Sequence, residues 1–171
     1  HLHGQSPLAA GYMTALMAAG WTVSEILSSG WTGRGPQRAI LAGPLFIVIG
    51  LVMLAITTPM ASLGEWMQLA PICLGLFLVG FGIGLGWPHL LTRILQVASE
   101  QDKDTAAASI TTLQLFAMAM GAALAGVISN VAGINDATGN AGIANAALWL
   151  FGLFTVAPVL ALVMARRAVR S

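Results

Sequence analysis

Five apolar stretches, each about as long as a membrane-spanning helix, alternate with short polar segments along this chain of 171 residues. They cover residues 7–29, 39–58, 71–97, 105–131 and 143–165. A tilted helix of about 20 apolar residues is long enough to cross the roughly 30 Å hydrocarbon core of a bilayer. Because the backbone must satisfy its own hydrogen bonds in lipid, each stretch is predicted to be helical. The sequence therefore predicts an all-α polytopic membrane protein with five transmembrane helices.

The composition indicates that most of the chain is embedded in a lipid bilayer, and it argues against several functions. Charged residues make up 8% of the chain, whereas a typical soluble domain has about a quarter, so an ordinary water-facing surface is not expected. No basic stripe that would bind nucleic acid is present. The single Cys73 excludes a disulfide framework. No set of nucleophile, base or metal ligands is apparent, so we expect neither an enzyme nor a metal or cofactor site.

The Lys and Arg residues all fall on one side if successive stretches cross the membrane in turn. The segments 1–6, 60–70 and 133–142, which would share the opposite side, contain neither residue type. The cationic side holds Arg34, Arg38, Lys103, Arg166, Arg167 and Arg170, with Arg93 just inside a helix end. By the positive-inside rule, this side is cytoplasmic. We therefore predict a multi-pass protein of a bacterial-type inner membrane with a cytoplasmic C-terminus. The odd number of helices, and a start inside an outer loop without Met, predict a piece of a longer protein.

The stretches differ in composition, which predicts which of them are internal. The second and fifth are rich in large aliphatic residues and are predicted to be peripheral, whereas the first, third and fourth contain many small residues that let helices approach closely in lipid. Helix packing is predicted at the glycines of the third and fourth stretches, namely Gly80, Gly82, Gly84, Gly86, Gly121 and Gly126.

Four segments carry a resemblance to a known family. They are residues 6–12, residues 33–38, residues 80–88, and the Ala-Ala-Ala-Ser run at 106–109 followed by Thr112, Gln114 and Gly121. Together they resemble the C-terminal part of a major facilitator superfamily transporter, most closely the fourteen-helix drug/proton antiporters. The inner-loop motif is represented by Gly33, Arg34, Gly35 and Arg38, but the Asp that usually precedes the first Arg is missing.

The resemblance implies that residues 1–171 form part of the C-terminal six-helix domain, without its first helix and without the N-terminal domain. In such transporters two related domains rock around a central site. The third stretch would line the cavity, the first and fourth would face the partner domain, and the second and fifth would face lipid. The implied function is proton-coupled export of drugs or small metabolites by alternating access, as in multidrug efflux. The implied partners are the bilayer, a small-molecule substrate, the proton and the missing N-terminal domain. A non-transporting structural subunit of a membrane complex is the alternative.

Glu25 and Arg93 are the charged residues that lie inside apolar stretches. A carboxylate within the membrane is costly and should face protein or a wet cavity, so Glu25 is a candidate for proton coupling or gating. The alternative is a carboxylate that reaches the interface or is paired structurally. Arg93 lies at a similar depth, and we expect it to approach Glu25 in one conformation, which lowers the cost of both charges. Its alternative role is to extend to the headgroups as an anchor.

Three further residues are candidates for the substrate cavity. His89 precedes Arg93 by four residues, on the same helix face. It is a candidate proton relay because histidine is the residue type suited to that role near physiological pH; otherwise it is a polar wall residue. Trp87 can stack on a flat or cationic substrate, or it can simply pack. Gln114, together with Thr111 and Thr112, can bind substrate or form interhelical hydrogen bonds.

Overall fold

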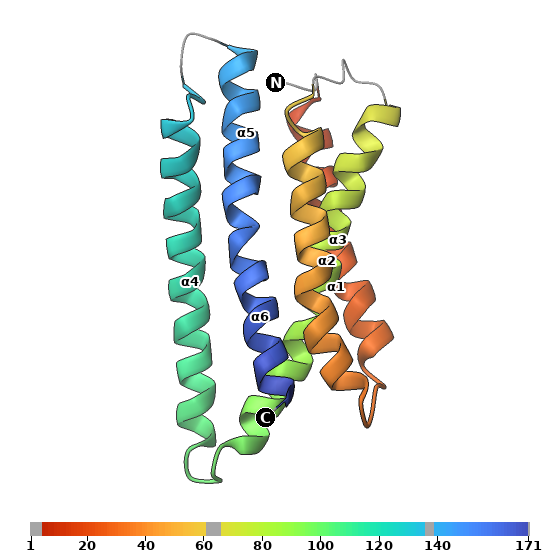
Figure 1. The fold of residues 1–171 in the computed structure, drawn as a ribbon, viewed down its shortest axis with the longest axis vertical. Helices are drawn as coiled ribbons and strands as arrows, with labels where there is room; N and C mark the ends of the chain where they lie inside the picture. Colours follow the sequence, from red (N-terminus) through yellow and green to blue (C-terminus); the bar gives the residue numbers. More distant parts are fainter. Residues whose placement is uncertain (1–4, 61–65, 136–138, 171) are drawn as a thin grey trace.

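The structure, a computed structural model, describes residues 5–60, 66–135 and 139–170, and these residues contain helices and no strands. The helices are α1 (Pro7–Ser28), α2 (Gly35–Thr57), α3 (Trp66–Val97), α4 (Lys103–Val131), α5 (Asn140–Phe154) and α6 (Val156–Arg170). Helix α5 is separated from α6 by Thr155 alone, and the two follow one another as nearly one rod in Figure 1.

Four of the five predicted crossings are confirmed as candidate membrane spans by their length and apolar composition. They are Gly35–Thr57, Leu69–Val97, Lys103–Val131 and Asn140–Arg167, the last of which runs through α5 and α6. Helix α1 is 22 residues long but is not among the four. Its Ser, Thr and Gly residues and Glu25 lower its mean hydropathy below that of the four candidate spans. The chain is thus a helical, multi-pass membrane protein, with α1 as a helix whose crossing stays a prediction.

The helix ends differ from the predicted ends by three to five residues in four places: the starts of α2, α3 and α5 and the end of α6. Helix α2 begins at Gly35 because Pro36 lies in its first turn, where the missing amide hydrogen costs nothing. Helix α3 begins at Trp66, before Pro71, which the prediction had used as its first residue. The start of α1 is as predicted: the Ser6 hydroxyl accepts a hydrogen bond from the Ala9 amide at 3.2 Å, and Pro7 follows.

Helix α3 is the centre of a three-helix unit with α1 and α2 (Figure 1). A Cβ on Gly80 would overlap the Met17 carbonyl of α1, and a Cβ on Gly84 would overlap the Trp21 carbonyl and the Ser24 hydroxyl. On its other face, a Cβ on Gly82 would overlap the Gly43 carbonyl of α2. The backbones of the three helices therefore approach each other through glycine, as is common in membranes.

Large aliphatic residues pack around the close contact between Gly50 of α2 and Gly75 of α3. Leu54, Leu69, Ile72 and Val79 form a buried cluster there. The second stretch was predicted to be peripheral, but α2 buries one face against α3, and its buried residues include Ala39, Ile40 and Gly50 as well as Leu54. Helix α2 is therefore not only peripheral, because one of its faces packs closely against the central helix α3.

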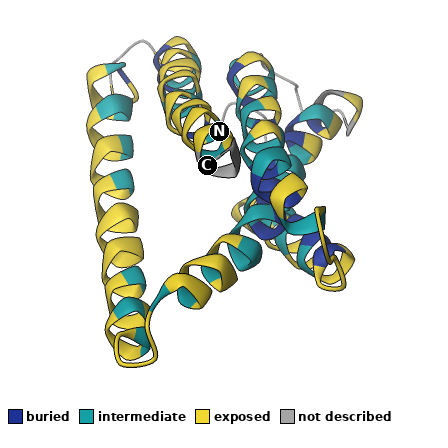
Figure 2. Cartoon of the chain, turned by 60° about the horizontal axis from the view of Figure 1, so that its bottom comes forward, coloured by how far each residue is buried: buried dark blue, intermediate teal, exposed yellow. Residues whose placement is uncertain are grey.

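Helix α4 stands apart from the three-helix unit, as Figures 1 and 2 show. It has no buried residue, and residues 111–120 are all exposed. A Cβ on Gly121 or Gly126 would meet no atom within 4 Å. Its neighbour is α5, where the Asn145 amide donates a hydrogen bond to the Ala132 carbonyl at 2.7 Å. The fourth stretch, predicted to be internal, is therefore uncovered within the described chain.

Candidate functional site

A pocket of about 800 Å³ lies between α2, α3 and α6, and we call it the α2–α3–α6 pocket. Most of its wall is aliphatic, Trp87 is its aromatic residue, and Arg93 is its charged one. Its full lining is Ile40, Pro44, Ile47, Gly82, Ile83, Gly86, Trp87, Leu90, Arg93, Ile94, Val97, Ala161, Met164 and Ala165. A volume of this size is within the range of small-molecule sites in proteins.

The wall that α3 contributes follows from helical spacing. Gly82, Gly86, Leu90, Arg93 and Val97 recur every three or four residues and so lie on one face. The glycines at the upper part of this face let α2 come close, because a Cβ on Gly43 would lie 2.7 Å from the Gly82 carbonyl. Below them the side chains are larger, α2 and α3 separate, and the pocket opens.

Glu25 lies on α1, partly buried, and is held by a residue of its own helix. The indole Nε1 of Trp21 donates a hydrogen bond to Glu25 Oε1 at 2.5 Å, across one helical turn. The neighbouring Ser24 is buried against Gly84 of α3, and its hydroxyl donates to the Trp21 carbonyl at 2.8 Å. The spacing of four residues on one helix could have indicated this pair from the sequence.

Glu25 and Arg93 do not form an ion pair in this structure. Among the described residues, the ion pair present joins Lys103 to Glu100 at the start of α4. Arg93 lies on the wall of the α2–α3–α6 pocket, whereas the Glu25 carboxylate is bonded to Trp21 on α1. The hypothesis that the two approach each other concerned one conformation of the protein, and it stays a prediction.

His89 stacks on a residue that the sequence analysis did not select. Its ring lies 6.5 Å from that of Trp31, centroid to centroid, with 16° between the planes. Trp31 belongs to the turn between α1 and α2, so the stack joins this turn to α3. The Nε2 atom of His89 is buried without a hydrogen-bond partner in the described part of the chain. Trp31 and His89 are far apart in the sequence, so no local residue spacing could have indicated this contact.

The inner-loop motif forms the turn that carries Trp31. Gly33 has φ +60°, a left-handed conformation that favours glycine, and Gly35 starts α2 with its Cα facing Trp31, where a Cβ would lie 2.7 Å from the Trp31 Cβ. Arg34 is exposed. Arg38 lines a smaller pocket of about 360 Å³ together with Trp31 and residues of all three helices of the unit.

The predicted cavity residues do not come together in this structure. Trp87 lines the α2–α3–α6 pocket, His89 stacks on Trp31 outside that lining, and Gln114 is exposed on α4. The hydroxyls of Thr111 and Thr112 donate to carbonyls of their own helix, at 3.1 and 2.9 Å. Among the residues that the structure describes, no group of three or more His, Cys, Asp or Glu is placed to hold a metal ion.

Comparison with known proteins relates this chain to bacterial transporters. No family model and no solved structure matches it. Two curated proteins of Mycobacterium tuberculosis do: "Probable multidrug-efflux transporter MT1670" of strain CDC 1551 / Oshkosh and "Probable multidrug-efflux transporter Rv1634" of strain ATCC 25618 / H37Rv. Each is 38% identical over 133 residues, which are 74% of this chain and 27% of the relative. The chain thus spans about a quarter of the length of the curated relatives it matches, and it is similar to one portion of a protein named as a probable multidrug-efflux transporter.

Proposed function

We propose that this chain is part of a secondary transporter that exports drugs or small metabolites in exchange for protons by alternating access. The observation that carries the proposal is the 38% identity, over 74% of the chain, to proteins named as probable multidrug-efflux transporters. The four apolar helices long enough to cross a bilayer support it, since export requires a membrane-embedded pathway. The resemblance of the inner-loop and glycine-rich segments to the major facilitator superfamily is consistent with the same mechanism.

The proposal places this chain in the C-terminal domain, opposite a domain that lies elsewhere in the complete protein. The exposure of α4 supports this placement, because a helix with Gln114, Thr111 and Thr112 on an uncovered surface offers polar groups to a facing domain or to substrate. In this arrangement, substrate binds near the midplane between the two domains. The tightly packed unit of α1, α2 and α3 then moves as one body while the two domains rock.

Glu25 is the proposed proton carrier. A carboxylate in an otherwise apolar helix is costly as an anion, so it should face protein or a wet cavity and not lipid. The Trp21 indole donates a hydrogen bond to Glu25 and so gives the anion one partner on its own helix. Proton binding at Glu25 would change the relative free energies of the inward-facing and outward-facing states, which is what coupling requires.

The experiment is drug-induced proton flux in vesicles that contain the complete natural protein with Glu25→Gln. We expect proton flux to be lost while drug binding is kept, because the amide preserves the shape but cannot release a proton. Glu100→Gln is the matched control, since Glu100 is an exposed acid in the loop before α4, and it should leave the flux unchanged. Unchanged flux in Glu25→Gln would remove Glu25 from the mechanism, and absence of drug export by the natural protein would refute the proposal as a whole.

A further inference from the structure

The α2–α3–α6 pocket combines a hydrocarbon-like wall with a cation at one end. Ile40, Ile83, Leu90 and Met164 come from three different helices and present aliphatic or thioether groups to the same space. Arg93 carries the charge among the described lining residues. A ligand that fits both features has a long apolar part and an anionic group.

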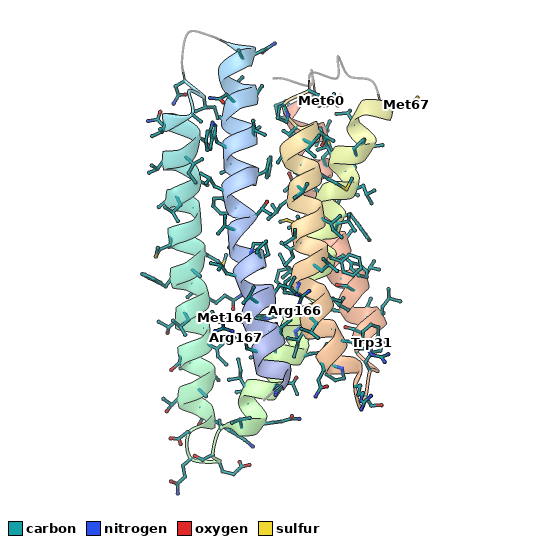
Figure 3. All side chains as sticks on the ribbon, in the orientation of Figure 1. Trp31, Met60, Met67, Met164, Arg166 and Arg167 are labelled. Carbon is teal, nitrogen blue, oxygen red and sulfur yellow. The ribbon has the colours of Figure 1, made fainter. Side chains whose placement is uncertain are left out.

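The position of the pocket places the cation near one face of the membrane. The lining runs along α3 from Gly82, in the middle of the helix, to Val97 at its end, and Arg93 lies about one turn before that end (Figure 1, bottom). Arg166 and Arg167 follow Ala165 directly and are exposed. Figure 3 shows both arginines beside Met164, at the same end of α6. If these helices cross the bilayer as predicted, the cationic end of the pocket lies at headgroup depth and its apolar wall lies toward the hydrocarbon.

We propose that this pocket binds an anionic phospholipid, with an acyl chain along the wall of α2, α3 and α6 and the phosphate beside Arg93. A basic pocket between transmembrane helices is the kind of site that holds anionic headgroups. The charge also decides between occupants. A cationic drug would be repelled by Arg93, whereas a zwitterionic lipid would gain less from it than an anionic one. The inference is independent of the transport function proposed above.

Trp87 provides a built-in reporter, because it lies on the wall of the pocket. Bromine atoms on a lipid acyl chain quench the fluorescence of a tryptophan that they touch. The complete natural protein is reconstituted in vesicles of phosphatidylcholine, and brominated phosphatidylglycerol or brominated phosphatidylcholine is added in steps. Since the chain has other tryptophans, the signal of Trp87 is taken as the quenching that is lost in Trp87→Phe.

We expect brominated phosphatidylglycerol to quench the Trp87 signal at a concentration about fivefold lower than brominated phosphatidylcholine, the factor that one basic residue near an anionic headgroup supplies. Arg93→Gln should remove this preference, and Arg93→Lys, which keeps the charge, should retain most of it. Arg34→Gln is the matched control, because Arg34 is an exposed cation of the α1–α2 turn outside the pocket lining. Ala161→Phe fills the pocket and should weaken quenching by both lipids.

Three results would overturn the proposal. Equal quenching by both lipids would mean ordinary boundary lipid without charge recognition. The absence of any Trp87-dependent quenching would mean that another part of the complete protein covers the pocket. Equal loss of preference in Arg34→Gln and Arg93→Gln would mean that the general charge of this face, and not the pocket, attracts the lipid. If Arg93→Gln fails to fold, the comparison of the two lipids, with the quenching lost in Trp87→Phe as the Trp87 signal, still decides the proposal.

Discussion

Helices α3 and α4 are built from similar residues, yet they occupy opposite environments. Both are about 30 residues long, 32 and 29, and both contain spaced glycines. On α3 each of Gly75, Gly80, Gly82 and Gly84 faces the backbone or a side chain of a neighbouring helix at a distance that excludes a Cβ. On α4, Gly121 and Gly126 face open space. Glycine spacing therefore shows where close approach is possible, whereas the surface of the neighbour decides whether it happens.

The strongest test of this contrast is Gly80→Leu. The new side chain would collide with the Met17 carbonyl of α1, and a backbone atom cannot rotate away as a side-chain end can. Overpacking of this kind costs about 3 kcal/mol or more of folding free energy. We expect a large fall in the thermal unfolding temperature of the complete protein. A fall no larger than that caused by Gly11→Leu, at a position with no atom within 4 Å, would contradict the packing of α1 on α3.

The next test, Gly121→Leu, asks what covers α4 in the complete protein. If α4 faces the other domain, as proposed, the added side chain should cost about 1 to 2 kcal/mol by overpacking and should lower drug export. Export and thermal unfolding measured side by side report both effects. Export and stability equal to those of the natural protein would mean that this face of α4 meets lipid.

A smaller effect is expected for Gly33→Ala, in the turn that connects α1 to α2. The left-handed φ of +60° is strained for alanine, which should cost about 1 kcal/mol. Gly30→Ala is the control, because Gly30 belongs to the same turn, has no left-handed φ, and has open space where its Cβ would be. Chemical unfolding of the two variants should separate them, and equal stabilities would show that the turn relaxes.

The smallest effect is expected at the start of α4, where Lys103 and Glu100 form an exposed ion pair. Exposed pairs of this kind contribute about 0 to 0.5 kcal/mol because water and salt screen them. Lys103→Gln should therefore leave the unfolding temperature within experimental error at physiological salt. A clear loss of stability would show that another part of the complete protein buries this end of α4.

The sequence predicted the helices well, because the requirement for an apolar stretch of fixed length is local. It also located the glycines of α3, although not their partners. It placed the start of α3 too late, since Pro71 is tolerated inside a helix that continues around it. The pair of Trp21 and Glu25 was within reach of helical spacing. Helical spacing could not predict the stack of His89 on Trp31 or the pocket between α2, α3 and α6. Both depend on how segments distant in sequence pack together.

The last transmembrane segment is broken at Thr155 into two helices, α5 and α6. Pro158 has no amide hydrogen, so the backbone hydrogen bond to the Phe154 carbonyl is missing. The Thr155 hydroxyl donates a hydrogen bond to the Phe151 carbonyl at 2.8 Å. The residues that α6 adds to the pocket, Ala161, Met164 and Ala165, all lie beyond this joint. One wall of the pocket therefore lies beyond the break in the last helix, so a change of bend at Pro158 would change the width of the pocket.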